Sequence, residues 1–273
     1  MKPKPAALAA PALALVLAAA ATACQSVGDG EAEHRTFRIG SDATTLTIDA
    51  DNTAVELVPA DEGADRAEVD VTRWFEAEKW NGDVGTEWSA DGDTLHFRTT
   101  CSGVIVSCDS RYRVEVPRRL AVKVDGSDGR ITANGLDTRL DITSADGSVA
   151  VGDAGGPLTV EARDGSVRVD GAAGPVDLDA RDGSVRATGL TAARVTAALG
   201  DGSLHLGFTE PPDDVTADTR DGGLTVELPK ASYRVHTDVR DGSTDVTVPR
   251  DPDSPHRIKA TVGDGSLTVR PAD

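Results

Sequence analysis

An Asp-Gly pair recurs through the second half of the chain, and this repeat constrains the fold more than any other feature of the sequence. Its aspartates stand at Asp128, Asp146, Asp164, Asp182, Asp201, Asp221, Asp241 and Asp264. The interval between successive aspartates is constant over the first four copies and then lengthens slightly toward the end of the chain. Self-similarity at a nearly fixed period is typical of repeat architectures, in which each copy is one supersecondary unit.

Each unit shows the alternation of two half-buried strands joined by a turn. Counted from each aspartate, the residues six and four before it and three and five after it are apolar at 30 of 32 positions. The two exceptions are Thr237 and Thr244. The intervening residues, five and three before and four after, are polar at 22 of 24 positions. Strict period-two alternation predicts strands and excludes helices in this region.

Two folds satisfy this alternation. Because Asp-Gly is a strong hairpin signal, an antiparallel meander is the alternative to a parallel solenoid. A flat meander would leave one apolar face uncovered, and the repeats contain no helix to cover it. A solenoid solves this, since each coil folds its apolar face against its own other half and like residues stack. We therefore predict an all-β chain with a parallel β-helix, or β-solenoid, of about eight coils of 18–20 residues, each lying on the coil before it.

Residues 1–23 have the composition of a secretory signal peptide. Lys2 and Lys4 precede an almost wholly apolar stretch that ends in Ala21-Thr22-Ala23, directly before Cys24. This arrangement is similar to a bacterial lipobox, from which it departs at Ala21, where leucine is commoner. We expect residues 1–23 to be removed and Cys24 to carry lipid, which would anchor the protein to the outer face of the bacterial cytoplasmic membrane. Plain secretion is the alternative, because Ala-Thr-Ala is also an ordinary signal-peptidase site.

Cysteine parity agrees with lipidation of Cys24. Cys101 and Cys108 then remain as an even pair in an oxidising compartment, and a disulfide between them would close a short loop. Residues 24–35 are polar and without periodicity, which predicts a flexible tether behind the lipid. We predict that residues 36–118 form an irregular, β-rich capping region and that residues 119–273 form the solenoid.

Seven of the nine aromatic residues fall between residues 36 and 118. Open solenoid ends expose core and strand edges, so the first interpretation of these rings is that they build a cap. The alternative interpretation is an aromatic platform for a glycan or a protein partner, which would use Trp74, Trp80 and Trp88.

The formal net charge of −18 limits the partners. Removal of residues 1–23 would delete two lysines and no acid, which leaves −20. A field this negative repels phosphate backbones, so we expect no nucleic-acid partner and no polybasic contact with lipid headgroups. We expect attachment to the membrane through the lipid anchor, and an unidentified extracellular protein or glycan as partner. The sequence does not fix the oligomeric state.

Stacking would bring the eight aspartates to one corner, about 4.8 Å apart, with a repulsion of roughly 1 kcal/mol per neighbouring pair in water. Ca²⁺ ions could relieve this repulsion. Arginines directly before the aspartates offer the same relief in four units, and the nonapeptide of calcium-binding β-rolls is absent. The five histidines also lack metal-ligand spacing such as HxxxH. We therefore predict a turn-forming corner with no metal and no cofactor.

An enzyme is the competing class, because parallel β-helices also carry polysaccharide lyases and hydrolases. Such a site would need acid–base groups together with basic or aromatic side chains on adjacent coils. Within the repeats only Phe208 and Tyr233 supply rings. We therefore predict no catalytic residue, and an extracellular glycan-active enzyme stands as the alternative.

The segment from about Arg111 to Val269 resembles a family of bacterial exported proteins. The resemblance rests on Tyr112-Arg113-Val114-Glu115-Val116-Pro117 after a cysteine, and on the Asp-Gly-Ser-(Val/Leu) series. The family comprises putative adhesins of unknown function and is related to the head GIN domains of adhesin-like proteins. The resemblance implies a parallel β-helix at the cell surface and carries over no catalytic residue. It favours a cell-surface lipoprotein whose solenoid serves as an adhesion, binding or scaffolding module.

Overall fold

The computed structural model describes residues 25–27, 30–63 and 67–272, and every regular element in them is a β-strand. The predicted signal peptide and Cys24 lie outside these residues. The described part of the chain contains no helix of the length and apolarity that crossing a membrane requires. The strands are β1 (Gln25–Val27), β2 (Glu33–Arg38), β3 (Thr45–Asp51), β4 (Ala54–Pro59), β5 (Glu68–Asp91), β6 (Thr94–Val116), β7 (Ala121–Asn134), β8 (Leu140–Ala154), β9 (Leu158–Ala172), β10 (Val176–Leu190), β11 (Arg194–Phe208), β12 (Asp214–Leu228), β13 (Arg234–Val246) and β14 (Arg257–Pro271).

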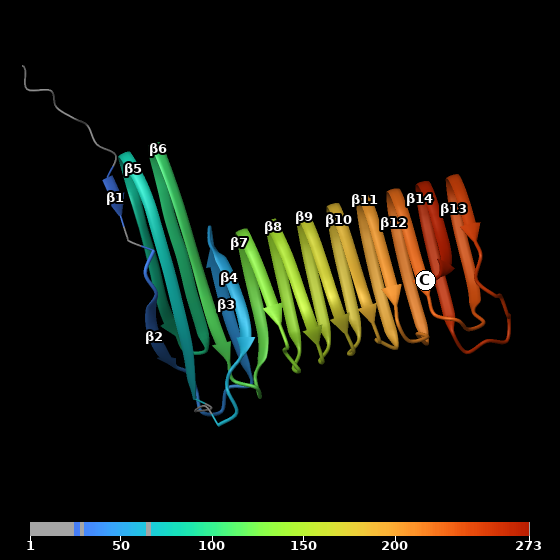
Figure 1. The fold of residues 1–273 in the computed structure, drawn as a ribbon, viewed down its shortest axis with the longest axis horizontal. Helices are drawn as coiled ribbons and strands as arrows, with labels where there is room; N and C mark the ends of the chain where they lie inside the picture. The colour runs from blue at the N-terminus through green and yellow to red at the C-terminus, as the bar shows by residue number, and fades with distance from the viewer. Residues whose placement is uncertain (1–24, 28–29, 64–66, 273) are drawn as a thin grey trace, which may run out of the picture.

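The repeat unit is one long strand that folds over at its Asp-Gly pair, so that each coil contributes two half-strands to the elongated stack (Figure 1). Neighbouring coils pair in parallel, and the register places aspartate on aspartate and glycine on glycine. Between β9 and β10, for example, Asp164 lies beside Asp182 and Val167 beside Val185. The all-β solenoid is confirmed, and the antiparallel meander is excluded for the repeats because their pairing is parallel.

The core is aliphatic and runs the length of the stack. The four inward positions predicted from the repeat are buried through the middle coils, as in β10, where Val176, Leu178, Val185 and Ala187 are at most 3% exposed. The position two before the aspartate also faces inward, which continues the alternation although the sequence count did not include it. Its buried members are Ser144, Ala180, Leu199, Thr219 and Val262. Burial of each Val or Leu contributes about 1.5–3 kcal/mol, so a coil is stabilised mainly by its contact with the next one.

The last two coils exchange places. β14 pairs with β12 on one side and with β13 on the other, so β13 is the outermost coil (Figure 1). The prediction that every coil lies on the one before it is therefore wrong for β13 and β14. Both exceptions to the apolar pattern, Thr237 and Thr244, belong to β13. A coil with a neighbour on one side only buries less surface, so hydroxyls cost less there than in the interior.

The N-terminal end is closed by a long hairpin. β3 and β4 form a further coil that pairs in parallel with β7, and β6 pairs in parallel with the opposite edge of both. β5 then pairs antiparallel with β6 over almost its whole length. The outer edge of β5 is covered by β1 and β2. Residues 25–27 and 33–35 are thus paired strands, which corrects the prediction of a flexible tether over residues 24–35 where the structure describes it. The exposed strand edge of β5 supplies the reason, since its free N–H and C=O groups need partners.

The hairpin is taller than the coils. Arg98 of β6 lies beside Asp51, and Arg111 of β6 lies beside Ala54. Between these two points β6 has residues 99–110, whereas the β3–β4 coil has only Asn52 and Thr53. This longer stretch continues upward beyond the corner and returns, and β5 follows it (Figure 1). We call residues 75–86 of β5 and 99–110 of β6 the crest. At about 3.3 Å per residue, roughly five additional residues on each side raise it by about 16 Å above the corner.

Candidate binding surfaces

The base of the crest is held by hydroxyl groups and a disulfide. The Oγ of Ser110 lies 2.6 Å from the Oγ1 of Thr99 and donates to the Oγ1 of Thr53 at 2.8 Å. All three side chains are buried, so these hydrogen bonds satisfy groups that water does not reach. Above them Cys101 and Cys108 form the expected disulfide, with their Cα atoms 6.2 Å apart. The crest is therefore cross-linked just above its hydrogen-bonded base.

The tip of the crest exposes two large apolar side chains. Trp80 is 50% exposed and Val104 is 54% exposed, and these are the exposed large hydrophobic residues in the described part of the chain. Asn81 pairs with Val104 across the hairpin, so Trp80 and Val104 lie on adjoining strands, offset by one position. Scattered apolar residues on a surface are ordinary, whereas two side chains gathered at one projecting tip indicate a contact surface.

The other two tryptophans occupy different environments. Trp88 is only 8% exposed, and its ring lies between the guanidinium groups of Arg35 and Arg73, 4.6 and 4.7 Å from their central carbons. Its edge contacts Phe37 at a centroid distance of 6.0 Å. The partner contact predicted for Trp88 is therefore wrong, because this ring belongs to the packed cap. Trp74 is half-buried beneath the guanidinium group of Arg111, 4.3 Å from the ring centroid.

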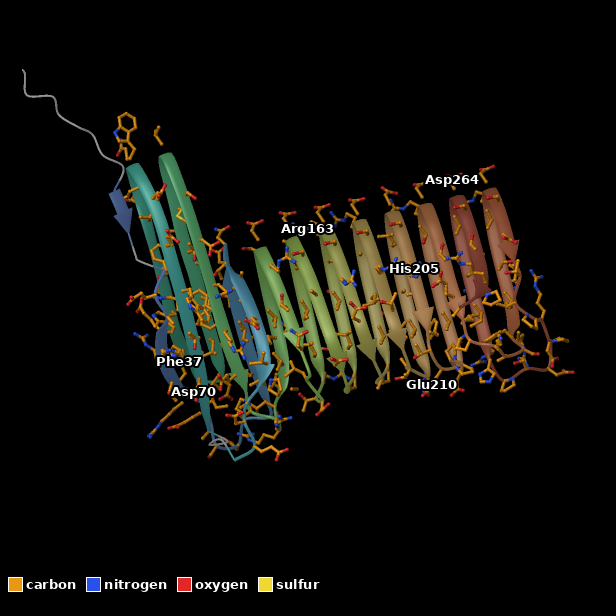
Figure 2. The ribbon with its side chains drawn as sticks, viewed as in Figure 1. Phe37, Asp70, Arg163, His205, Glu210 and Asp264 are labelled. Carbon is orange, nitrogen blue, oxygen red and sulfur yellow. A yellow bond between two sulfur atoms is a disulfide. The ribbon has the colours of Figure 1, made fainter. Side chains whose placement is uncertain are left out.

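The Asp-Gly pairs form a second surface, along the edge of the solenoid that carries Arg163 and Asp264 in Figure 2, opposite the edge that carries Glu210. We call this row of aspartates the acid ridge. Partial desolvation and the charges of Asp201 and Asp164 raise the pKa of Asp182. A hydrogen bond shared with Asp201, together with partial desolvation and Asp264, raises the pKa of Asp221. Neighbouring carboxylates in the stack therefore oppose each other's ionisation.

The ridge arginines interact with neighbouring coils as well as their own. Arg220 places its Nη1 3.9 Å from Asp201 of the coil before it. A Cβ on Gly200 would lie 3.1 Å from the Arg220 guanidinium, so the small residue leaves room for this reach. Together these coils border an open groove of about 640 Å³. Within the described residues, no group of three or more His, Cys, Asp or Glu side chains is arranged to hold a metal ion.

The two broad faces of the solenoid differ in charge. On the face before the corner, the two rows five and three residues before the aspartate hold seven acids and two lysines; the acids are Asp125, Asp141, Glu161, Asp177, Asp179, Asp218 and Asp238. The row seven before the aspartate, at the far edge of the same face, includes Arg194, Arg234 and Arg257 together with Asp214. On the face after the corner, three arginines are matched by three acids; they are Arg168, Arg186, Arg270, Asp170, Glu227 and Asp245. Short ion pairs lie along and across the strands of the second face: Arg168 lies 2.8 Å from Asp170 of the same strand, whereas Arg270 of β14 pairs with Glu227 of β12. A hydrogen bond from Thr188, followed by those from Arg168, lowers the pKa of Asp170.

One outward residue of the second face is less solvated than its position suggests. The side chain of His205 is 18% exposed, and its Nε2 lies 3.4 Å from the Oε2 of Glu227. Burial lowers the pKa of His205, although Glu227 opposes the shift. The neighbouring coils therefore cover this ring and favour its neutral form.

Sequence reasoning did not predict the crest as a structure, although it singled out Cys101, Cys108 and Trp80 within it. A signal was present in the sequence. Gly82 and Gly103 adopt φ of 138° and 139°, and each faces the backbone of the other's strand. They turn the tips of β5 and β6 as the Asp-Gly glycines turn the coils.

Stacked parallel coils, closed at one end by an antiparallel hairpin, define a β-solenoid. Among the described residues it has no cluster of side chains arranged to hold a metal ion. Residues 44–270 match the family model of Toastrack DUF4097, and the chain belongs to this family.

Solved structures similar to the chain come from several bacteria. A putative adhesin from Bacteroides fragilis is 15% identical, with 89% of this chain and 98% of that one covered and a TM-score of 0.44. A putative cell adhesion protein from Clostridium sporogenes is 8% identical, with 89% and 100% covered and a TM-score of 0.23. A putative lipid binding protein from Parabacteroides distasonis is 10% identical, with 90% and 98% covered and a TM-score of 0.32. Comparison with curated proteins yields no match.

Proposed function

We propose that this protein is an exported, lipid-anchored Toastrack protein whose non-catalytic solenoid acts as a binding or scaffolding module, with adhesion as its role. The observation that carries the proposal is the in-register parallel stack. It arranges outward side chains in straight rows with a repeat of about 4.8 Å. Such rows match an extended partner that itself repeats, such as a glycan or a fibrous protein, better than a compact small molecule.

The two broad faces of the solenoid differ in charge, so they suit different partners. The face after the corner carries Arg168 and Arg186 in one row, on neighbouring coils, where an acidic or hydroxyl-rich partner would find donors. On the face before the corner, the two rows nearest the corner are acidic and suit a basic partner. The exposed tryptophan of the crest, Trp80, supplies a third contact surface.

Attachment to the membrane rests on the sequence from Met1 to Cys24. Lipidation at Cys24 places the protein on the outer face of the cytoplasmic membrane, and secretion without lipid is the alternative. Mass spectrometry of the mature amino terminus distinguishes them. We expect a diacylated Cys24 as the first residue of the mature chain, and a Cys24→Ser variant should leave the membrane fraction. An unmodified cysteine would contradict the anchor.

Partner binding is tested with the mature protein on arrays of glycans and of extracellular proteins. Charge-neutralising variants of each face supply the contrast: Arg168→Gln with Arg186→Gln on one, and Asp177→Asn with Asp179→Asn on the other. We expect one pair of substitutions to lower the affinity for a captured partner at least about tenfold, while the other pair leaves binding unchanged. A tenfold change corresponds to roughly 1.4 kcal/mol, which is about what one charged contact contributes. Equal binding by all variants, or reproducible cleavage of a polysaccharide, would overturn the proposal.

A further inference from the structure

We infer that the tip of the crest rests on the phospholipid surface to which the chain is anchored, with Trp80 and Val104 in contact with the outer face of the bilayer. This rests on the lipid anchor of the proposed function and names the partner of the crest. The position of β1, the exposed side chains of the tip and the height of the crest all point to this contact.

The chain enters the fold beside the tip. β1 pairs antiparallel with β5, so that Gln25 lies opposite Lys79 and Val27 lies opposite Ala77. Lys79 directly precedes Trp80, and Cys24 is bonded to Gln25. A lipid on Cys24 therefore begins within a few residues of the tip. Such an anchor holds this end of the molecule, and not the far end at β13, against the bilayer.

The tip has the chemistry of a membrane-interface contact. Trp80 and Val104 are about half exposed, so they lose little packing when they leave water. Tryptophan is enriched at membrane–water interfaces because its ring is apolar while its indole N–H finds polar partners. Burial of apolar surface contributes about 25 cal/mol per Å², which adds a second contact to the single anchor.

The crest is built to hold this contact in place. The disulfide between Cys101 and Cys108 joins the two halves of β6 within the crest, and β5 backs them through an antiparallel ladder. A cross-linked tip loses less conformational entropy on binding than a free loop would. The tip is therefore preorganised.

The height of the crest separates the membrane from the acid ridge, so that the acids nearest the lipid are those of the crest itself, such as the exposed Asp83 beside Gly82. The acid ridge lies along the same edge as the crest (Figures 1 and 2), so a lower tip would bring its aspartates to the headgroups. The crest rises about 16 Å above the corner, whereas the Debye length at physiological salt is about 8 Å. The aspartates of the coils next to the crest are thus screened from anionic lipids while the tip touches the surface.

Two points of attachment fix an orientation that one flexible anchor would not. With Cys24 and the tip both at the bilayer, the edge opposite the acid ridge, marked by Glu210 in Figure 2, faces away from the membrane. The two broad faces then stand clear of the lipid. The contact therefore leaves the partner surfaces of the solenoid accessible.

Quenching of tryptophan fluorescence by brominated lipid tests this contact. The full protein is purified from the membranes of the producing cell and reconstituted into vesicles of phosphatidylcholine and phosphatidylglycerol that contain brominated phosphatidylcholine. We expect brominated lipid to quench the Trp80→Phe variant at least about twofold less than the parent, because Trp80 is the exposed ring among the three tryptophans. The matched control, Trp74→Phe on the same strand, should quench as the parent does. Equal quenching of the parent and Trp80→Phe, with the protein bound, would overturn the inference.

A second arm separates this inference from the anchor itself. The mature chain carrying a hexahistidine segment before Gln25 is held on vesicles with nickel-chelating lipid, which replaces Cys24 lipidation. Quenching that depends on Trp80 in this arm supports the crest contact even where mass spectrometry finds Cys24 unmodified, whereas its absence overturns it. Lower salt gives a further readout: at about 0.01 M the Debye length grows to about 30 Å, so quenching should fall on anionic vesicles and persist on pure phosphatidylcholine.

Discussion

Asp182 and Asp201 occupy the same register position on neighbouring coils, and each faces a further aspartate on its other side. Their mutual repulsion is one of the causes that raise the pKa of Asp182, beside partial desolvation. The corner therefore combines a favoured backbone turn with an unfavourable row of charges. Selection of Asp at this place is explained by the turn, since Asp-Gly pairs favour a change of backbone direction.

Replacement of Asp182 with asparagine should raise the melting temperature at neutral pH and low salt. A carboxyl whose pKa is higher in the folded than in the unfolded state destabilises the fold when both states are ionised. This penalty disappears as the pH falls through the folded pKa towards the unfolded value, so the advantage of Asp182→Asn should shrink in acid and in high salt. Thermal denaturation across pH and salt measures it.

Asp170 supplies the control with the opposite sign. Its pKa is lowered by the hydroxyl of Thr188 and by Arg168, so its ionised form is the one that stabilises the fold. Asp170→Asn should lower the melting temperature at neutral pH, and that loss should vanish below the folded pKa. A loss from Asp170→Asn without any gain from Asp182→Asn would show that the stacked charges are fully screened.

Substitution of the corner glycine should be severe. Gly183 has φ of +123°, and a Cβ there would lie 1.9 Å from the carbonyl oxygen of Gly165 on the next coil. Left-handed backbone strain and overpacking together predict a loss of about 2–5 kcal/mol for Gly183→Ala. Gly223 is the matched control, since its φ is ordinary and its nearest neighbour is Ser266 Oγ at 3.7 Å. Gly223→Ala should change the unfolding free energy by less than about 1 kcal/mol in chemical denaturation.

Removal of the disulfide should loosen the crest without unfolding the solenoid. The bond closes a loop with a sequence separation of 7 residues. Loop-closure entropy then predicts a local loss of roughly 2.5 kcal/mol for Cys101→Ser with Cys108→Ser. Hydrogen exchange should accelerate in residues 99–110 and stay unchanged in β9 and β10, whose burial does not involve the crest. Protection lost throughout the chain would mean that the crest nucleates the whole fold.

The solenoid could be predicted from the sequence because its determinants are local. Asp-Gly fixes each corner, and inward residues such as Val167 and Val185 meet their like on the next coil whatever lies further away. The pairing of β5 with β6 is different in kind. It joins residues as far apart as Asp70 and Glu115, and no period relates the two strands. The crest and the burial of Trp88 follow from that pairing, so sequence pattern alone could not supply them.

The order of the last two coils was also beyond the pattern, although the sequence held a clue. β13 and β14 share the same alternation, so either could follow β12. What distinguishes them is the pair of threonines, Thr237 and Thr244, at positions that are apolar in every other coil. The free energy of the whole stack is lower when the less apolar coil has solvent on one side. A count of exceptions per coil would therefore have identified the terminal one.

Because β14 lies between two coils and β13 lies at the end, substitutions at equivalent positions of these coils should change stability by different amounts. Leu267 of β14 is 1% exposed and packs between two coils, so Leu267→Thr should destabilise the protein by about 2–4 kcal/mol through lost burial and a buried hydroxyl. Thr244 stands at the equivalent position of β13 and is exposed, so Thr244→Val should change stability by no more than about 0.5 kcal/mol. Urea denaturation gives both values. A large gain from Thr244→Val would mean that β13 is buried in solution, as it would be if a second copy of the chain covered the open end.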